Sequence, residues 1–222
     1  MLGRTRVALA LILLAAGPAT AEPVSGLKAN THVHGLAVDR NDPAYLFIAT
    51  HHGLYRAGPD GEAERVSIAQ DLMGFSAHPS DANILYASGH PAGGANLGFI
   101  ASSDGGRTWS QVSPGANGPV DFHQMTVSLA DPTTMYGAYG DLQTSRDGGN
   151  TWTIVAPAPD RLISLAASSS DAEVVYAATE RGLLNSLDAG KSWRPLIDTA
   201  PVTMVQVTAD GTMYAFLLGH GL

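Results

Sequence analysis

The sequence predicts an all-β fold, a β-propeller built from four-stranded antiparallel blades. Three observations lead to this prediction. An eight-residue phrase ending in Trp occurs three times, at steps of 43 and 41 residues, and a fixed period of this size is typical of a repeated supersecondary unit. The residues between the copies form short apolar runs separated by turn residues, which is the pattern of β-strands. These runs recur in the same order in each repeat, as expected for successive blades.

The repeated phrase has the form S-x-D-x-G-x-[TS]-W, which predicts a tight turn followed by a strand. Gly permits positive φ angles, the Asp carboxylate accepts hydrogen bonds from loop N–H groups, and the Ser and Thr hydroxyls make weaker bonds of the same kind. The closing Trp is a large apolar anchor that opens the next strand. The defining residues are Ser102, Asp104, Gly106 and Trp109, then Ser145, Asp147, Gly149 and Trp152, then Ser186, Asp188, Gly190 and Trp193.

This phrase resembles the Asp-box, or BNR repeat, of sialidases and related propellers, and the resemblance extends through the repeats over nearly the whole chain. It implies a sialidase-like, glycosyl hydrolase-like propeller whose boxes are peripheral structural hairpins and not the active site. Sialidases bind a substrate carboxylate with three converging Arg residues. Here Arg107 and Arg146 belong to the boxes, and only Arg161 and Arg181 map to the face of the propeller opposite the boxes, where a binding site is expected. The typical sialidase arginine triad is therefore not evident.

Residues 1–21 have the features of a secretory signal peptide. Arg4 and Arg6 precede an apolar run over residues 7–16, and small residues at 19–21 offer a cleavage site. The sequence therefore predicts export to the periplasm or secretion, and a propeller domain over 22–222 that has no membrane span. This domain carries 10 basic and 20 acidic residues, a balance that argues against nucleic acid and anionic membranes as partners.

The expected strands follow one another blade by blade. In each blade, two strands joined by a polar turn precede a third strand that leads into the Trp-ended phrase, and the Trp opens the fourth strand. In the first blade the phrase has degenerated to residues 58–61. The first two strands of successive blades are expected at 35–38 and 46–49, 74–77 and 85–87, 125–129 and 135–138, 162–167 and 174–178, and 204–207 and 213–216.

About 4.5 blades are expected, which predicts an incomplete ring. The last residues, 216–222, align with 48–54 of the first blade, where the chain continues into a third strand. Because propellers avoid open strand edges by closing their ring, this alignment favours a C-terminally truncated copy of a longer protein. The alternative is a small five-bladed ring whose last blade takes strands from residues 22–33.

The histidines are expected to gather at one rim of the propeller. In an antiparallel blade, the start of the first strand and the end of the second lie at the same rim, and the Trp-ended phrases lie at the other. Of the 8 histidines, only His78 falls at the rim of the phrases. The others are His32, His34, His51, His52, His90, His123 and His220.

The alignment of the repeats predicts a pocket at this rim. His32 and His34 align with Asp71 and Met73 in the second repeat, with Asp121 and His123 in the third, and Arg161 takes the first of these positions in the fourth. Because first strands line the central channel, these side chains are expected to converge at its mouth, opposite the phrases. The expected ligand-binding residues are His32, His34, His51, His90, His123 and Arg161.

Such a pocket would suit a metal ion or a small polar ligand, including a glycan. Imidazole favours zinc or copper, and a thioether favours copper, so a transition metal would be held by the set His34, His123, His32, Asp121 and Met73. No HExxH spacing occurs, so the site would be assembled from separate blades. One alternative is a sialidase-like glycoside hydrolase with Asp71 and Asp121 as its catalytic pair. A second alternative is a non-catalytic propeller that docks a protein partner. A third is that the histidines are solvated surface residues with no ligand.

Overall fold

The structure, a computed structural model, describes residues 21–91 and 93–222. Apart from Ala21, the expected signal peptide lies outside the described residues. Within them the chain forms five antiparallel β-sheets and one short helix, so the predicted all-β propeller is confirmed. No helix in the described part is long and apolar enough to cross a membrane.

The chain forms its sheets one after another. The first contains β2 (Val33–Val38), β3 (Leu46–Thr50), β4 (Gly53–Ala57) and β5 (Glu62–Arg65), with β1 (Glu22–Pro23) added at its outer edge. The second contains β6 (Met73–Ala77), β7 (Leu85–Ser88), β8 (Phe99–Ser102) and β9 (Ser110–Ser113). The third contains β10 (Gln124–Val127), β11 (Met135–Tyr139), β12 (Asp141–Ser145) and β13 (Thr153–Pro157). The fourth contains β14 (Leu162–Ala167), β15 (Val175–Thr179), β16 (Gly182–Ser186) and β17 (Arg194–Ile197), and the fifth only β18 (Val202–Val207) and β19 (Met213–Leu217).

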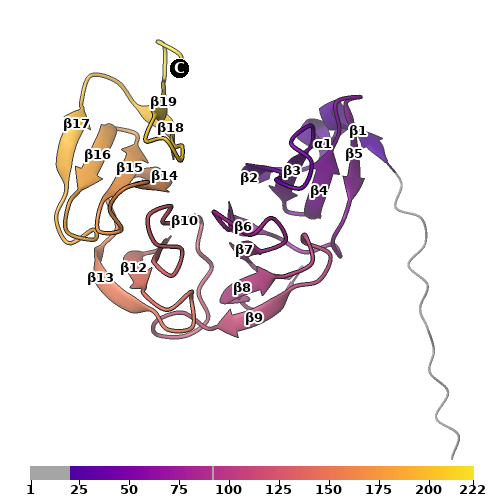
Figure 1. Cartoon of the computed structure of the whole chain (residues 1–222), viewed down its shortest axis with the longest axis horizontal. Coiled ribbons are helices and arrows are strands. Elements are labelled where there is room, and N and C mark those ends of the chain that lie inside the picture. The colour runs from indigo at the N-terminus through magenta and orange to yellow at the C-terminus, as the bar shows by residue number, and fades with distance from the viewer. Residues whose placement is uncertain (1–20, 92) are drawn as a thin grey trace, which may run out of the picture.

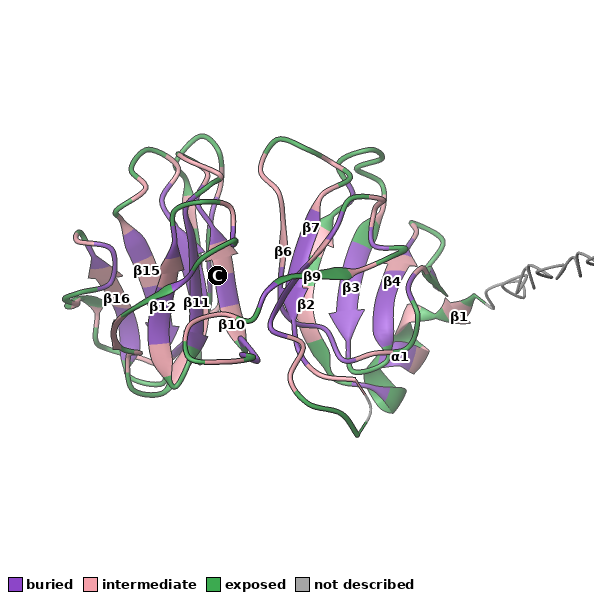
Figure 2. Ribbon diagram, turned by 90° about the horizontal axis from the view of Figure 1, so that it is seen from below, coloured by how far each residue is buried: buried purple, intermediate pink, exposed green. Residues whose placement is uncertain are grey.

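The sheets stand around a common centre as the blades of a propeller (Figure 1). The first strand of each sheet lies innermost, in the order β2, β6, β10, β14 and β18, and the fourth strands lie at the periphery. Buried residues concentrate in the middle of the strands and exposed residues in the loops at both rims (Figure 2). The strands therefore act as a rigid support, and the loops at the rims are free to carry function.

The N-terminal segment differs from the expectation. The alternative in which residues 22–33 complete the last blade is wrong, because β1 pairs with β5 of the first blade through Glu22 and Ala63. The next residues form α1 (Val24–Asn30), a helix that the repeat pattern did not indicate. Its Leu27 is 2% exposed and packs with Ile48 and Tyr55 of the first blade. Burial of this side chain, the pairing of β1 with β5 and the hydrogen bond from Val24 N–H to the Gly61 carbonyl at 2.9 Å together hold the segment in place.

The three Trp-ended phrases form the same turn. In the first, the Asp104 carboxylate accepts hydrogen bonds from the Thr108 N–H at 2.9 Å, the Thr108 hydroxyl at 2.7 Å and the Ser102 hydroxyl at 2.8 Å. The Ser102 hydroxyl also accepts the Gly106 N–H at 2.8 Å. The second and third phrases repeat this network around Asp147 and Asp188. The expectation that the Asp carboxylate closes the turn is therefore confirmed.

The glycine two residues after the Asp of each phrase joins its blade to the blade before. A Cβ at Gly106 would clash with Leu54 of β4, and the equivalent clashes are Gly149 with Phe99 of β8 and Gly190 with Leu142 of β12. All three neighbours lie on the third strand of the preceding blade. The glycine is thus required twice at this position, for its positive φ angle and for the close approach of the next blade.

Candidate functional site

A buried carboxylate, that of Asp71, lies at the centre of a group of histidines. Its side chain is 5% exposed, and three imidazoles approach it. The His51 Nδ1 and His90 Nε2 atoms lie 2.9 Å and 3.2 Å from Asp71 Oδ2. The His34 Nε2 atom lies 3.4 Å from Asp71 Oδ1. We call these four residues the Asp71 cluster.

The cluster is assembled from the first two blades at the rim opposite the Trp-ended turns. His34 lies on β2 and His51 in the turn between β3 and β4, whereas Asp71 precedes β6 and His90 follows β7. Backbone hydrogen bonds hold the segments together, from Asp71 N–H to the His90 carbonyl at 3.2 Å and from Leu72 N–H to the Thr50 carbonyl at 3.1 Å. The blade-to-blade crossing therefore brings Asp71 among the histidines.

One glycine allows this approach. Gly89 has a φ of +123°, and a Cβ at this position would clash with the Asp71 backbone carbonyl. Any other residue would push the His90 segment away from Asp71. The geometry of the Asp71 cluster thus depends on a residue that has no side chain to contribute.

The polar atoms of the cluster approach each other without forming aligned hydrogen bonds. His34 Nε2, Asp71 Oδ1 and Asp71 Oδ2 are buried and have no hydrogen-bond partner within the described residues, although the N···O distances are only 2.9–3.4 Å. The two observations are compatible, because a hydrogen bond also requires the donor to point at the acceptor. Buried polar atoms without partners are costly, by about 1–3 kcal/mol each. This arrangement leaves lone pairs of the cluster available to a cation.

Burial lowers the pKa of His34 from its ordinary value. Asp71 acts in the opposite direction, and the neighbouring His51, His32 and His123 lower the pKa further. His34 is therefore neutral at pH 7, which is the form of imidazole that binds metals.

A further imidazole, that of His32, lies beside the cluster, tilted by 44° against the His51 ring. The ring centroid of His32 lies 5.2 Å from that of His51, and the His34 and His51 centroids are 4.3 Å apart. The gathering of His32, His34, His51 and His90 at one rim is thus confirmed as a geometric fact. The side chains of His51 and His90 are 40% and 44% exposed, so the cluster is open to solvent on one side.

The membership of the cluster differs from the expected metal set. Within the described residues, His34, His51 and Asp71 are the one group of three whose potential ligand atoms all lie within 4.8 Å of one another. Asp71 was expected as a catalytic carboxylate and His51 as a ligand-binding residue, and the expected metal set of His34, His123, His32, Asp121 and Met73 did not include them. Although His51 follows β3 and His34 lies on β2, their rings meet edge to face, with centroids 4.3 Å apart. Sequence alignment gave the positions of both residues but not this contact.

Other expected residues lie elsewhere or have other partners. His123 Nε2 lies 3.3 Å from Asp121 Oδ2, and this pair is separate from the group of three. Asp121 is buried, and its Oδ1 has no partner within the described residues. Met73 is buried on β6. Arg161 Nη1 donates to Glu180 Oε2 at 2.6 Å, so its guanidinium is already paired.

His78 lies apart from the cluster, as the sequence predicted. Its Nδ1 accepts backbone N–H groups of Ser80 at 3.1 Å and Asp81 at 3.0 Å in the turn between β6 and β7. This histidine caps a turn at the rim of the Trp-ended phrases.

Comparisons with known proteins support the fold. No family model matches the chain, and no curated protein matches it. Among solved structures, an ancestral GH74 enzyme is 16% identical with a TM-score of 0.60, over 82% of this chain and 27% of that one. A gluconolactonase from Xanthomonas campestris is 14% identical with a TM-score of 0.58, over 83% and 69%. YCF48 bound to D1 peptide is 16% identical with a TM-score of 0.57, over 93% and 66%.

These similarities concern the β-propeller fold alone, because all the identities are low. The chain also spans only 27%, 33% and 36% of the three GH74 enzymes that it matches. Propellers with enzymatic and with peptide-binding descriptions match it about equally well. The function therefore has to be argued from the side chains at the rim.

Proposed function

We propose that this protein is an exported β-propeller that binds a divalent transition metal ion, zinc or copper, at the Asp71 cluster. The ligands are His34, His51 and Asp71, and His90 is placed to serve as a fourth. The observation that carries the proposal is the set of unaligned N···O contacts at 3.4, 2.9 and 3.2 Å around one buried carboxylate. Ligand atoms of a tetrahedral zinc site lie about 3.3 Å apart, because each is about 2.0–2.1 Å from the ion.

The donor set supports these metals over others. Imidazole nitrogens and one carboxylate oxygen suit zinc or copper(II), whereas magnesium and calcium prefer oxygen ligands throughout. The chain has no Cys, and Met73 has no contact with the cluster among those described, so the soft ligands that select copper(I) are not part of this proposal. Two half-exposed histidines leave room for a water or a small ligand on the ion, as in open zinc sites.

Paired variants test the metal site. We expect His51→Ala to reduce the affinity for zinc or copper, measured by isothermal titration calorimetry on metal-free protein. Loss of a residue that only supports a metal ligand costs about 10–100-fold in affinity, and loss of the ligand His51 should cost more. The adjacent His52→Ala removes an exposed imidazole outside the cluster and should change nothing. Asp71→Asn should lower the metal affinity as His51→Ala does. Asp121→Asn, like His52→Ala, should leave the metal affinity unchanged. Equal affinities of the His51 and His52 variants would refute the proposal.

A second hypothesis, a glycoside hydrolase with Asp71 and Asp121 as its catalytic pair, is supported by one feature. Both carboxylates are buried at the same rim, and each has an oxygen without a hydrogen-bond partner within the described residues. The same Asp variants separate the two hypotheses. Cleavage of a chromogenic glycoside that is lost in both Asp71→Asn and Asp121→Asn would favour the hydrolase, and metal loss confined to Asp71→Asn favours the metal site.

Two further inferences complete the proposed function. Residues 1–21 act as a signal peptide that is removed on export, which fits their basic start and apolar run. The Trp-ended turns are Asp-boxes with a structural role, since their carboxylates are already occupied by Thr or Ser of the same turn. Neither the signal peptide nor the Asp-boxes contribute to the proposed metal site, which lies at the opposite rim.

A further inference from the structure

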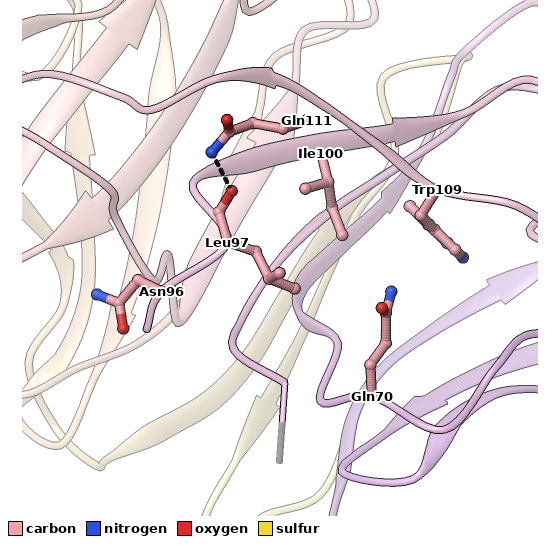
Figure 3. A pocket seen from close by; sticks show the side chains of 6 residues that line it. All are labelled: Gln70, Asn96, Leu97, Ile100, Trp109 and Gln111. Carbon is pink, nitrogen blue, oxygen red and sulfur yellow. Dashed lines mark hydrogen bonds between the residues drawn. The ribbon is translucent and has the colours of Figure 1, made fainter. Parts of the chain in front are cut away.

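A cavity of about 290 Å³ lies on the second blade, beside the segment that connects this blade to the first. Six residues line it: Gln70 before β6, Asn96 and Leu97 before β8, Ile100 on β8, and Trp109 and Gln111 at the start of β9 (Figure 3). Its volume lies just below the range of about 300–1,000 Å³ that is typical of ligand pockets. A ligand with one ring is the size that such a cavity holds.

The lining combines apolar surface with carboxamides and carries no charge. Leu97 and Trp109 pack against the apolar core of the first two blades, to which Ile100 belongs. The Trp109 indole is fixed in orientation, because its N–H donates to the Gly106 carbonyl at 3.0 Å. The polar part consists of three amide side chains. An ionised ligand would find no counter-charge here, and a purely apolar one would leave the amides without partners.

The hydrogen bonds already made define what the amides can still offer. Gln111 Nε2 donates to the Leu97 carbonyl at 2.6 Å, and Asn96 Nδ2 donates to the Pro119 carbonyl and the Tyr139 hydroxyl at 3.1 and 3.0 Å. Their carbonyl oxygens accept no hydrogen bond among those described. Both residues are therefore left with acceptors.

Gln70 provides the complementary group. Its Nε2 is buried and has no hydrogen-bond partner within the described residues, and Figure 3 shows its carboxamide extending toward Ile100 and Trp109. A buried donor without a partner is unfavourable unless a ligand or a water supplies an acceptor. The cavity thus has a buried donor without a partner at Gln70, and at its solvent-exposed edge the Asn96 and Gln111 carbonyl oxygens accept no hydrogen bond among those described.

We propose that this cavity binds a neutral pyranose sugar, either free or as one unit of a glycan. Sugar hydroxyls both donate and accept hydrogen bonds, so they match a lining that offers both without charge. The C–H face of a pyranose ring is apolar, and it would lie against Trp109 and Ile100. The lining residues differ from those of the Asp71 cluster, although Gln70 directly precedes Asp71 in the chain.

The test is a titration of the full chain with methyl glycosides of glucose, galactose and xylose, followed by Trp fluorescence. We expect saturable binding of at least one glycoside, and binding at least about tenfold weaker for Gln70→Leu, which corresponds to the loss of one hydrogen bond. Gln206→Leu, on β18 and outside the cavity, should bind like the parent. Glucuronate, which is charged, should bind about tenfold more weakly than the glucoside.

Thermal unfolding keeps the outcome interpretable. Gln70→Leu removes a buried donor that has no partner, so this variant should be as stable as the parent without sugar, or more stable. His51→Ala should bind the glycoside like the parent, which separates this site from the metal site. No saturable binding of any neutral glycoside, or unchanged binding by a folded Gln70→Leu variant, would overturn the proposal.

Discussion

The two glycines of the first Trp-ended turn offer a direct test of how the blades are joined. Gly105 and Gly106 are adjacent and have similar φ angles, +70° and +87°. A Cβ at Gly105 would meet only the end of the Arg107 side chain, at 3.5 Å. A Cβ at Gly106 would clash with Leu54, which is 0% exposed in the core of the first blade. The two positions therefore share a backbone cost and differ in packing.

The expected magnitudes follow from these contacts. Gly105→Ala pays only for a left-handed non-Gly residue, about 1–2 kcal/mol. Gly106→Ala has the same backbone cost and also overpacks the junction of the two blades, which destabilises the fold by about 1–3 kcal/mol more. In a domain of this size, each kcal/mol lowers the Tm by about 2–4 °C. Gly106→Ala should therefore melt about 2–12 °C below Gly105→Ala.

Calorimetric or circular-dichroism melts of the two variants measure this difference directly. A double variant supplies a second test, because Leu54→Ala removes the side chain with which the new methyl group clashes. The cost of Gly106→Ala should then be smaller in the Leu54→Ala background, with a coupling of about 0.5–3 kcal/mol. Equal melting temperatures for Gly105→Ala and Gly106→Ala would refute the account of blade packing given above.

Two other predictions concern the turns and the core. Hydrogen bonds from Ser192 and Ser186 lower the pKa of Asp188 to about 2. The stability that the ionised Asp188 contributes is therefore present above about pH 4 and is lost as the pH falls toward 2. The Tm difference between the parent and Asp188→Asn should shrink over this range, and a constant difference would contradict the assignment. Ser88 is 0% exposed and accepts the Phe122 N–H at 2.9 Å; Ser88→Ala should cost about 1–3 kcal/mol in urea unfolding, and the exposed Ser110→Ala close to nothing.

The sequence determined the order of strands and the structure of the turns, because both depend on residues close together in the chain. The repeated Ser, Asp, Gly and Trp positions predicted the same turn three times, and the structure has it three times. Short apolar runs separated by turn residues likewise predicted the first two strands of every blade within a few residues. The helix α1 was not predicted because its seven residues have no side-chain N-cap, and because contacts with the first blade, those of Leu27 among them, stabilise it.

The rim at which the histidines lie also followed from the sequence, because antiparallel pairing fixes the rim at which each strand begins and ends. Which of them meet was decided only by the tertiary structure. Asp71 becomes the centre of the cluster because Gly89 allows a close approach of two loops, and the His51 ring contacts that of His34. Such contacts depend on how one blade sits against the next.

The cavity on the second blade shows the same division. Nothing in the spacing of Gln70, Trp109 and Gln111 relates them, and Trp109 was expected only as an anchor of its turn. They come together because the chain crosses from the first blade to the second just where β9 begins beside it. Local sequence thus specifies each blade, and the packing of neighbouring blades decides which side chains share a site, because that packing depends on the shapes of residues far apart in the chain.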